Sequence, residues 1–219
     1  MKQNGQFLIA FLISLFSLIG FCVMAILVSG KRIVQFDQSV ISFIRGFESS
    51  VVTSIMKFFT FIGSLPFVLV ISLIALILLD KVLKHRIELL LFIVVMIGTP
   101  LLNQVLKFVF QRARPDFHRL IEVEGFSFPS GHAMSAFAVY GILSFLLWRH
   151  IPTRLGRVTL IMFSSLFILM IGVSRIYLGV HYPSDIIGGY FASSCWLAIA
   201  IWIFQRLKSE ARRKKTWVE

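Results

Sequence analysis

Apolar residues in this sequence stand in long unbroken blocks and seldom alternate with polar residues. A helix needs about 20 mostly apolar residues to cross a bilayer, so blocks of this kind are typical of membrane-embedded chains. The composition agrees, because the 219 residues are 58% hydrophobic and only 15% charged, whereas soluble domains carry about 25% charged residues. We therefore predict an all-α fold, a six-transmembrane-helix bundle that forms a single integral membrane domain over residues 1–219. The expected spans are residues 7–30, 65–79, 88–106, 133–148, 158–173 and 186–204.

Residues 33–62 follow a different pattern. Apolar side chains recur there at every third or fourth position, and polar residues such as Asp37, Arg45 and Lys57 fall between them. This period predicts an amphipathic helix that is too polar to span a membrane. We expect an interfacial segment between the first two spans, with a break at Gly46.

The basic residues indicate how the bundle is oriented. Six spans place both termini on one side, together with Lys81, Lys84, Arg86 and the basic C-terminal tail, and the positive-inside rule makes that side cytoplasmic. The net charge of +12 is spread between the apolar blocks and this tail, which favours contact with anionic membrane lipids over nucleic-acid binding. The opposite side nevertheless carries cations that topology alone leaves unexplained: Lys31, Arg32, Lys107, Arg112, Arg114, Arg119 and Arg175.

Three polar clusters lie at span ends on that extracytoplasmic side. The stretch KFVFQRARP begins with Lys107, the stretch FPSGH ends with His132, and the stretch GVSRIYLGVHYPSD ends with Asp185. Taken singly, each has a structural interpretation: cations at a helix end can reach the interface, Ser130 can cap a helix, and Arg175 can pair with Asp185. Taken together, they bring several ionisable groups to one membrane edge, which indicates a functional site.

The cations in these clusters indicate an anionic ligand. Lys107, Arg114 and Arg175 supply three positive charges without a matching excess of acid, and arginine suits the geometry of phosphate. The free backbone N–H groups of Gly131 and His132, at the start of the fourth expected span, add a second anion-binding element. A dianionic phosphate group fits this set of donors.

The histidines then indicate a reaction. His181 precedes Pro183, which suits the first position of a helix, so Asp185 falls in the first turn and can bond one imidazole nitrogen. The other nitrogen is then free to attack phosphorus, while His132 protonates the leaving oxygen and later activates water. The expected intermediate is a phosphohistidine. The nearby acids show no recognised metal-ligand spacing, so we expect neither a metal nor another cofactor; these acids are Asp116, Glu122, Glu124 and Asp185.

The combination resembles the signature of the type 2 phosphatidic acid phosphatase superfamily in its membrane branch. The signature reads K-x6-RP, PSGH and SR-x5-H-x3-D, and every position is filled here over about 80 residues. The resemblance implies a helical fold and metal-independent dephosphorylation of a lipid. It implies that Lys107, Arg114, Ser130, Gly131 and Arg175 bind phosphate, that His132 is the general acid, that His181 is the nucleophile and that Asp185 orients it.

The substrate stays open at this point. Length and short loops are similar to those of bacterial members acting on phosphatidylglycerophosphate or undecaprenyl diphosphate, and phosphatidate is a third candidate. Residues 33–62 and 116–128 are where we expect the lipid entrance to be shaped. Two other classes remain as alternatives: a vanadate-dependent haloperoxidase, against which the six apolar spans count, and a non-catalytic anion- or lipid-binding protein or transporter. No obligate protein partner is indicated.

Overall fold

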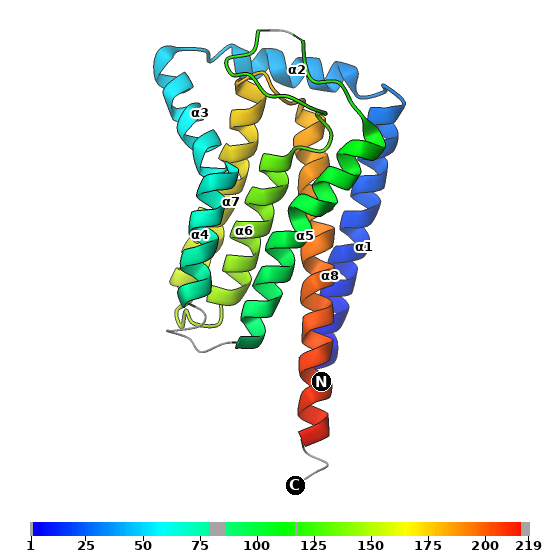
Figure 1. Cartoon of the computed structure of the whole chain (residues 1–219), viewed down its shortest axis with the longest axis vertical. Coiled ribbons are helices and arrows are strands. Elements are labelled where there is room, and N and C mark those ends of the chain that lie inside the picture. The colour runs from blue at the N-terminus through cyan, green and yellow to red at the C-terminus, as the bar shows by residue number, and fades with distance from the viewer. Residues whose placement is uncertain (1, 79–85, 117, 216–219) are drawn as a thin grey trace.

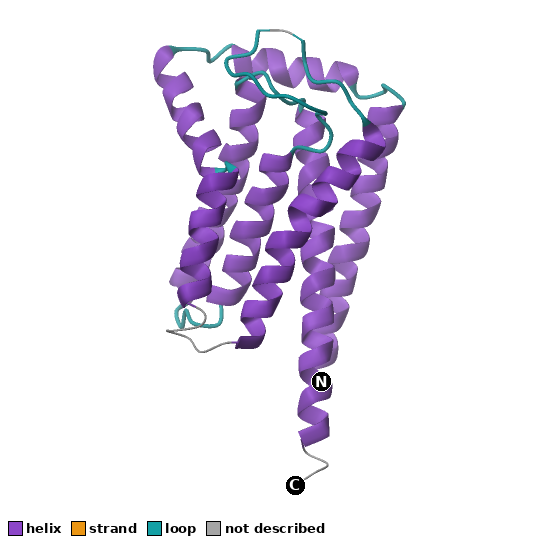
Figure 2. Ribbon diagram, viewed as in Figure 1, coloured by secondary structure: helices purple, strands orange, loops and turns teal. Residues whose placement is uncertain are grey.

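The computed structural model describes residues 2–78, 86–116 and 118–215, and in these ranges every regular element is a helix (Figure 2). The predicted all-α fold is thereby confirmed. Three sequence-based expectations fall outside the described residues: the end of the second span at residue 79, the cations Lys81 and Lys84, and residue 117 of the loop segment. The helices are α1 (Lys2–Ser29), α2 (Val34–Arg45), α3 (Ser50–Ile62), α4 (Leu65–Ile77), α5 (Arg86–Phe110), α6 (Gly131–Leu147), α7 (Arg154–Tyr177) and α8 (Pro183–Lys215).

The helices form an elongated bundle with two different ends (Figure 1). The short helix α2 lies across one end, where the long loop between α5 and α6 also lies, and both chain termini lie toward the opposite end. α8 is the central element, because it packs against α1, α6 and α5. The bundle core between α5, α6 and α8 is built from buried apolar side chains that include Phe92, Val95, Ile142 and Leu197.

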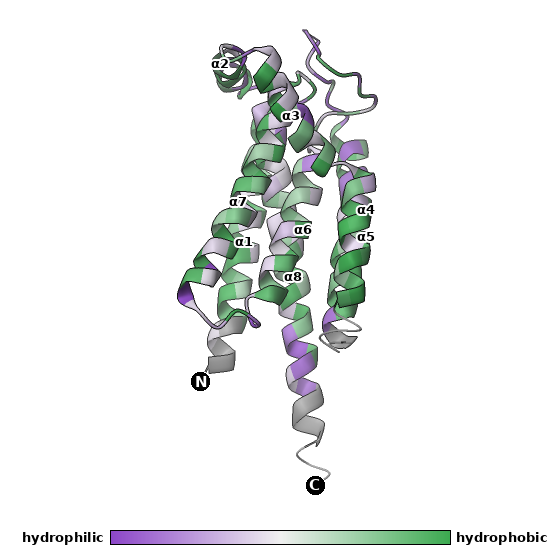
Figure 3. Ribbon diagram, turned by 90° about the vertical axis from the view of Figure 1, so that its left-hand side faces the viewer, coloured by the Kyte–Doolittle hydropathy of each residue, from purple (hydrophilic) through white to green (hydrophobic). Residues whose placement is uncertain are grey.

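Hydrophobic residues dominate the helices of the bundle (Figure 3), and many of the large apolar ones are exposed. Phe16 on α1, Leu73 on α4, Leu101 on α5 and Met162 on α7 are each at least 60% exposed, a surface that only a hydrocarbon environment accommodates. Four of the described helices are long and apolar enough to cross a membrane, namely those over Phe7–Ser29, Glu88–Phe110, Arg154–Tyr177 and Pro183–Glu210. The protein is therefore a multi-pass membrane protein.

The other two expected spans are less regular. α3 and α4 together pass the same length and hydropathy test, but they are bent by 52° at the break between them. α6 is apolar but has only 17 residues, which corresponds to about 25 Å of helix. The described residues thus contain four clear spans, or five when the bent pair is counted as one, and the predicted number of six is not established by the helices alone.

The segment 33–62 is two helices with different environments. The expected break at Gly46 is present, since α2 ends at Arg45 and the Ser49 hydroxyl caps α3 by accepting the N–H of Val52 at 3.3 Å. Only α2 lies across the end of the bundle; α3 packs against α7, so the expectation of one interfacial segment is wrong for this half. The reason is a polar contact at 2.8 Å between the hydroxyl groups of Thr53 and Tyr177, supported by apolar packing around Met56.

The break between α3 and α4 depends on glycine. A Cβ atom at Gly63 would lie 2.5 Å from Ile171 on α7 and 3.3 Å from the imidazole of His132 on α6. Only a residue without a side chain allows this approach. The bend thereby brings the α3–α4 pair directly against one of the residues singled out in the sequence.

Candidate active site

The predicted site residues come from six segments of the chain that meet at the α2 end of the bundle. Charge interactions connect them, because Lys107 is within electrostatic range of Arg114, Arg175 and Asp185. His132 is likewise within range of Lys107, Arg114, Arg175 and His181. In chain order, Lys107 lies in the last turn of α5, Arg114 in the following loop, Ser130 at the N-cap of α6, Gly131 and His132 in the first turn of α6, Arg175 in the last turn of α7, His181 in the α7–α8 turn and Asp185 in the first turn of α8.

His181 and Asp185 form a buried pair. The imidazole Nδ1 lies 3.3 Å from the carboxylate Oδ2, which also accepts the backbone N–H of Tyr182 at 2.9 Å. With Nδ1–H donated to the carboxylate, Nε2 carries the lone pair and accepts from Arg114 Nη1 at 3.1 Å. Burial lowers the pKa of His181 to about 4, an effect that Asp185 only partly opposes. Because this pKa lies well below 7, the imidazole is neutral at pH 7 and its Nε2 is available as a nucleophile.

Arg114 is held by backbone carbonyl groups. Its Nε donates to Gly125 at 2.9 Å, its Nη1 to Val180 at 2.9 Å and its Nη2 to Glu124 at 3.1 Å. Burial lowers the pKa of this guanidinium, yet carbonyl dipoles orient it without cancelling its charge. Gly179 allows the close approach of these loops, since its φ is +75° and a Cβ there would lie 2.6 Å from the His118 carbonyl oxygen.

Arg175 is the most deeply buried cation of the site. Its side chain is 2% exposed, and its Nη1 donates to the hydroxyl of Thr60 on α3 at 2.6 Å. Within the described ranges no carboxylate pairs with Arg175, and its Nε has no hydrogen-bond partner. A buried positive charge without a counter-charge is costly, so this guanidinium indicates an anionic ligand.

The first turn of α6 provides backbone donors. The Ser130 hydroxyl accepts the N–H of Ala133 at 3.4 Å, and the Ser130 N–H donates to the Asp185 carbonyl at 3.1 Å. The helix-cap interpretation of Ser130 is therefore confirmed. Helix geometry leaves the first N–H groups, those of Gly131 and His132, without intrahelical acceptors. Asn103 on α5 supports this turn by donating to the Pro129 carbonyl at 3.0 Å.

Sequence reasoning missed a group of polar residues behind Asp185. Arg112 donates from Nη1 to Asp185 Oδ1 at 2.6 Å and from Nη2 to Asp37 Oδ2 at 2.8 Å. Asp37, on α2, also accepts the N–H of Ser184 at 2.9 Å and its hydroxyl at 2.7 Å. The available signal was the Asp37 carboxylate in the amphipathic segment, and the sequence did not reveal which neighbour this carboxylate would meet. Thr60 and Asn103 were missed for the same reason.

The remaining loop histidine lies outside this cluster. His118 contacts Glu48 at 3.0 Å in an exposed pair, as an ordinary loop residue can. Within the described part of the chain, His, Cys, Asp and Glu side chains do not group into a candidate metal site.

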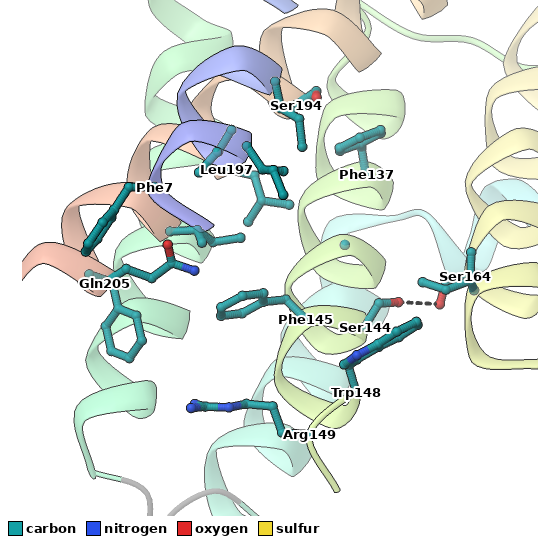
Figure 4. Close-up of a pocket in the computed structure, with 18 of the residues that line it drawn as sticks. Phe7, Phe137, Ser144, Phe145, Trp148, Arg149, Ser164, Ser194, Leu197 and Gln205 are labelled. Carbon is teal, nitrogen blue, oxygen red and sulfur yellow. Dashed lines mark hydrogen bonds between the residues drawn. The ribbon is translucent and has the colours of Figure 1, made fainter. Parts of the chain in front are cut away.

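A separate cavity lies in the other half of the bundle (Figure 4). It has a volume of about 710 Å³ and is lined by α1, α6, α7 and α8. None of the predicted site residues lines it. We refer to this cavity as the lateral crevice. Phe137 and Ser194 lie toward one end of it and Arg149 toward the other (Figure 4). Lys208 lines the same end as Arg149, because both side chains donate to Glu88.

Comparison with protein families gives a match over the part of the chain that carries the three clusters. The model of the PAP2 superfamily matches residues 88–209. Phosphatidylglycerophosphatase B of Bacillus subtilis is 41% identical over 91 residues, which are 41% of this chain and 45% of that protein. The match thus spans less than half the length of this relative.

Two solved structures share the fold. The crystal structure of a transmembrane PAP2-type phosphatidylglycerolphosphate phosphatase from Bacillus subtilis has a TM-score of 0.72 and 25% identity, and covers 91% of this chain and 96% of that one. The crystal structure of Aquifex aeolicus LpxE has a TM-score of 0.60 and 24% identity, and covers 75% of this chain and 93% of that one. The second similarity concerns the fold alone.

Proposed function

The chain belongs to the PAP2 superfamily, and from this premise we propose that it is a metal-independent membrane lipid phosphatase that acts through a phosphohistidine intermediate. The observation that carries the proposal is the pairing of an oriented, neutral His181 with two buried guanidinium groups, Arg114 and Arg175, that lack a carboxylate partner within the described residues. A histidine of fixed tautomer beside two guanidinium groups without carboxylate partners is suited to attack on phosphate. A protein that only binds anions needs no such nucleophile.

The reaction proceeds in two steps with the chain's own groups. In the first, the His181 Nε2 lone pair forms a bond to phosphorus while the bond to the lipid oxygen breaks, and His132 donates a proton to that oxygen. In the second, His132 accepts a proton from water as the water oxygen attacks phosphorus and the bond to Nε2 breaks. Asp185 holds the Nδ1 proton and stabilises the positive charge on the imidazole.

The cations would stabilise the charge that develops on the phosphoryl oxygens. Arg114 Nη1 points at the nucleophilic nitrogen of His181 at 3.1 Å, so a phosphate placed for attack meets this donor at once. Lys107, Arg175 and the N–H groups of Gly131 and His132 complete the donor set, and such oriented donors stabilise the transition state more than water does. Since the Ser130 hydroxyl caps α6, we assign Ser130 to the phosphate site through this turn.

We further propose six membrane crossings with both termini in the cytoplasm. α6 and the bent α3–α4 pair run between the two ends of the bundle alongside the four long helices, which supports counting each as a crossing (Figure 1). The candidate site lies at the end opposite the termini, so it would face the extracytoplasmic side and accept lipids of the outer leaflet. The proposed partners are membrane lipids, and no cofactor is required by the reaction.

The substrate class is a lipid phosphate monoester or diphosphate. The name of the Bacillus subtilis relative supports phosphatidylglycerophosphate, and undecaprenyl diphosphate and phosphatidate are the other candidates. Phosphate release by the purified protein should be measured in EDTA with these three lipids side by side. We expect release from at least one lipid without loss in the chelator. Activity that disappears in EDTA and returns with a divalent cation would contradict the metal-independent reaction, and no release from any lipid would contradict the enzyme assignment.

A further inference from the structure

The residues behind Asp185 form a closed network that reaches α2. Arg112 bridges the two carboxylates, contacting Asp185 at 2.6 Å and Asp37 at 2.8 Å, and it also donates to the Ser184 hydroxyl at 2.7 Å. Its guanidinium lies over the ring of Tyr182, with Cζ 4.0 Å from the ring centroid. Asp37 and Asp185 are 1% and 0% exposed, so both carboxylates of this network are shielded from water.

Asp37 acts on two neighbours at once. Its carboxylate accepts both the N–H and the hydroxyl of Ser184, so it caps the first turn of α8 from another helix. It also shares the charge of Arg112 with Asp185. If Asp37 did not pair with Arg112, the guanidinium would bind the Asp185 carboxylate more strongly. That ion pair would then compete with the contact at 3.3 Å between Asp185 Oδ2 and His181.

We infer that Asp37 on α2 is a positioning residue for the nucleophile, which acts through Arg112 and Ser184 on Asp185 and thereby on His181. The inference rests on the proposed function for its catalytic consequence, but the chain of contacts is independent of the substrate. Asp37 lies outside the residues matched by the family model, so α2 contributes to the site from beyond the family signature.

The test is a double-substitution cycle on Asp37 and Asp185. We expect Asp37→Asn to lower kcat by about 10–100-fold with little change in KM, as is common for residues that orient a catalytic group from behind. If Asp37 acts through Asp185, adding Asp37→Asn to Asp185→Asn should cost little more, whereas independent effects would multiply. Gln38→Ala, an exposed neighbour on α2, is the matched control and should leave kcat unchanged.

A second readout separates this inference from the proposed function. In ¹⁵N-histidine NMR spectra of the detergent-solubilised protein, Asp37→Asn should shift the His181 signals in the direction produced by Asp185→Asn, and Gln38→Ala should not. Unchanged His181 signals, or kcat losses that multiply, would overturn the inference. If the native protein released no phosphate, the proposed function would fail and the spectra would still decide on the contacts. Should Asp37→Asn not fold, Arg112→Lys, which lacks the planar fork that contacts both carboxylates, gives the same comparison.

The lateral crevice supports a second inference from different residues. It follows α8 from Ser194 to Lys208, about 21 Å of helix, which exceeds half of the 30 Å hydrocarbon core of a bilayer. Most of its lining is apolar, including Phe137, Phe145 and Leu197 (Figure 4). The crevice therefore has the length and the chemistry of an acyl-chain site.

The end of the crevice toward the termini is polar and basic. Arg149 and Lys208 both donate to the same oxygen of Glu88, at 3.2 Å and 2.7 Å, so the two cations exceed this carboxylate by one positive charge. Nearby, the Gln205 side-chain oxygen is buried without a hydrogen-bond partner among the described residues (Figure 4). A ligand with a negative charge and hydrogen-bond donors would pair with the two cations and with the Gln205 oxygen at this end of the crevice.

The geometry points to a binding site for one anionic glycerophospholipid of the leaflet on the termini side, with its acyl chains in the crevice and its phosphate at Arg149 and Lys208. Phosphatidylglycerol suits both requirements, because its phosphate is anionic and its glycerol hydroxyls can donate to Gln205. This lipid would be bound without reaction, since the crevice lies away from the candidate active site.

The site can be tested by native mass spectrometry. The protein is released from micelles that contain phosphatidylglycerol and phosphatidylcholine in equal amounts, and the lipid that stays bound is identified. We expect the native protein to retain one phosphatidylglycerol in preference to phosphatidylcholine. In Ser165→Trp the new indole fills the crevice, so retention of phosphatidylglycerol should fall about tenfold, equivalent to about 1.4 kcal/mol. Leu166→Trp, at an exposed position of α7 outside the crevice, is the matched control. Equal retention of both lipids, retention unaffected by Ser165→Trp, or a dimer that Ser165→Trp dissociates would each overturn the inference.

Discussion

Replacement of His181 by alanine is expected to abolish phosphate release, with a loss in kcat of about four orders of magnitude or more, because the variant lacks the Nε2 atom on which the covalent intermediate forms. His181 is the residue whose imidazole is both buried and oriented, with Asp185 on Nδ1 and Arg114 on Nε2. The measurement is single-turnover phosphate release from the preferred lipid. A parallel acid-labile phosphoenzyme signal should appear in the native protein and vanish in the variant.

His118→Ala is the matched control for this substitution. The His118 imidazole lies in an exposed pair with Glu48, so its loss should leave the rate within a factor of about two. Retention of most of the activity in His181→Ala would exclude the phosphohistidine reaction, and a different nucleophile would have to be sought among the residues of the same end.

Removal of the charge of Arg175 should have the second-largest effect. We expect Arg175→Gln to lower kcat/KM by about 10²–10³-fold, the usual cost of losing one oriented donor to a developing oxyanion. Arg175→Lys keeps the charge but loses the planar fork that reaches Thr60, so its rate should lie between those of the native protein and Arg175→Gln. Steady-state rates and the affinity for orthovanadate, an analogue of the transition state, are the measurements.

A cation at the same end provides the control for Arg175. Arg119 donates to the Pro115 carbonyl at 2.7 Å and lies 4.0 Å from Asp116, so it has partners of its own. Arg119→Gln should therefore change neither the rate nor vanadate affinity appreciably. Equal losses in the two variants would mean that general positive potential, and not placement of Arg175, governs catalysis.

Sequence alone was sufficient for the all-helical fold, and the residues that it singles out come together at one end of the bundle. The length of the apolar blocks identifies α1, α5, α7 and α8, because a helix that spans a membrane must consist mostly of apolar residues. The signature spacing brings His181 to Asp185 because α8 begins at Pro183, which places the Asp185 carboxylate in the first helical turn, beside the turn that carries His181. Both results depend on interactions between neighbours in the chain or on the surrounding solvent, which a single sequence records.

Contacts between distant segments could not be predicted in this way. The bend at Gly63 depends on Ile171 and His132, and the direction of α3 depends on Tyr177. The pairing of Asp37 with Arg112 joins residues separated by 75 positions. The periodicity of the sequence shows which face of α2 is apolar. It does not show that Asp37, in the first turn of α2, pairs with Arg112.

The placement of Asp37 and Thr60 has a consequence for how relatives can be recombined. Every signature residue lies within residues 88–209, yet α2 and α3 supply the groups that hold Arg112 and Arg175. A chimera joined before α5 would inherit a complete signature from one parent and its supports from the other. Its two halves must therefore agree at the pairs Asp37–Arg112 and Thr60–Arg175, so a working chimera needs both partners of each pair.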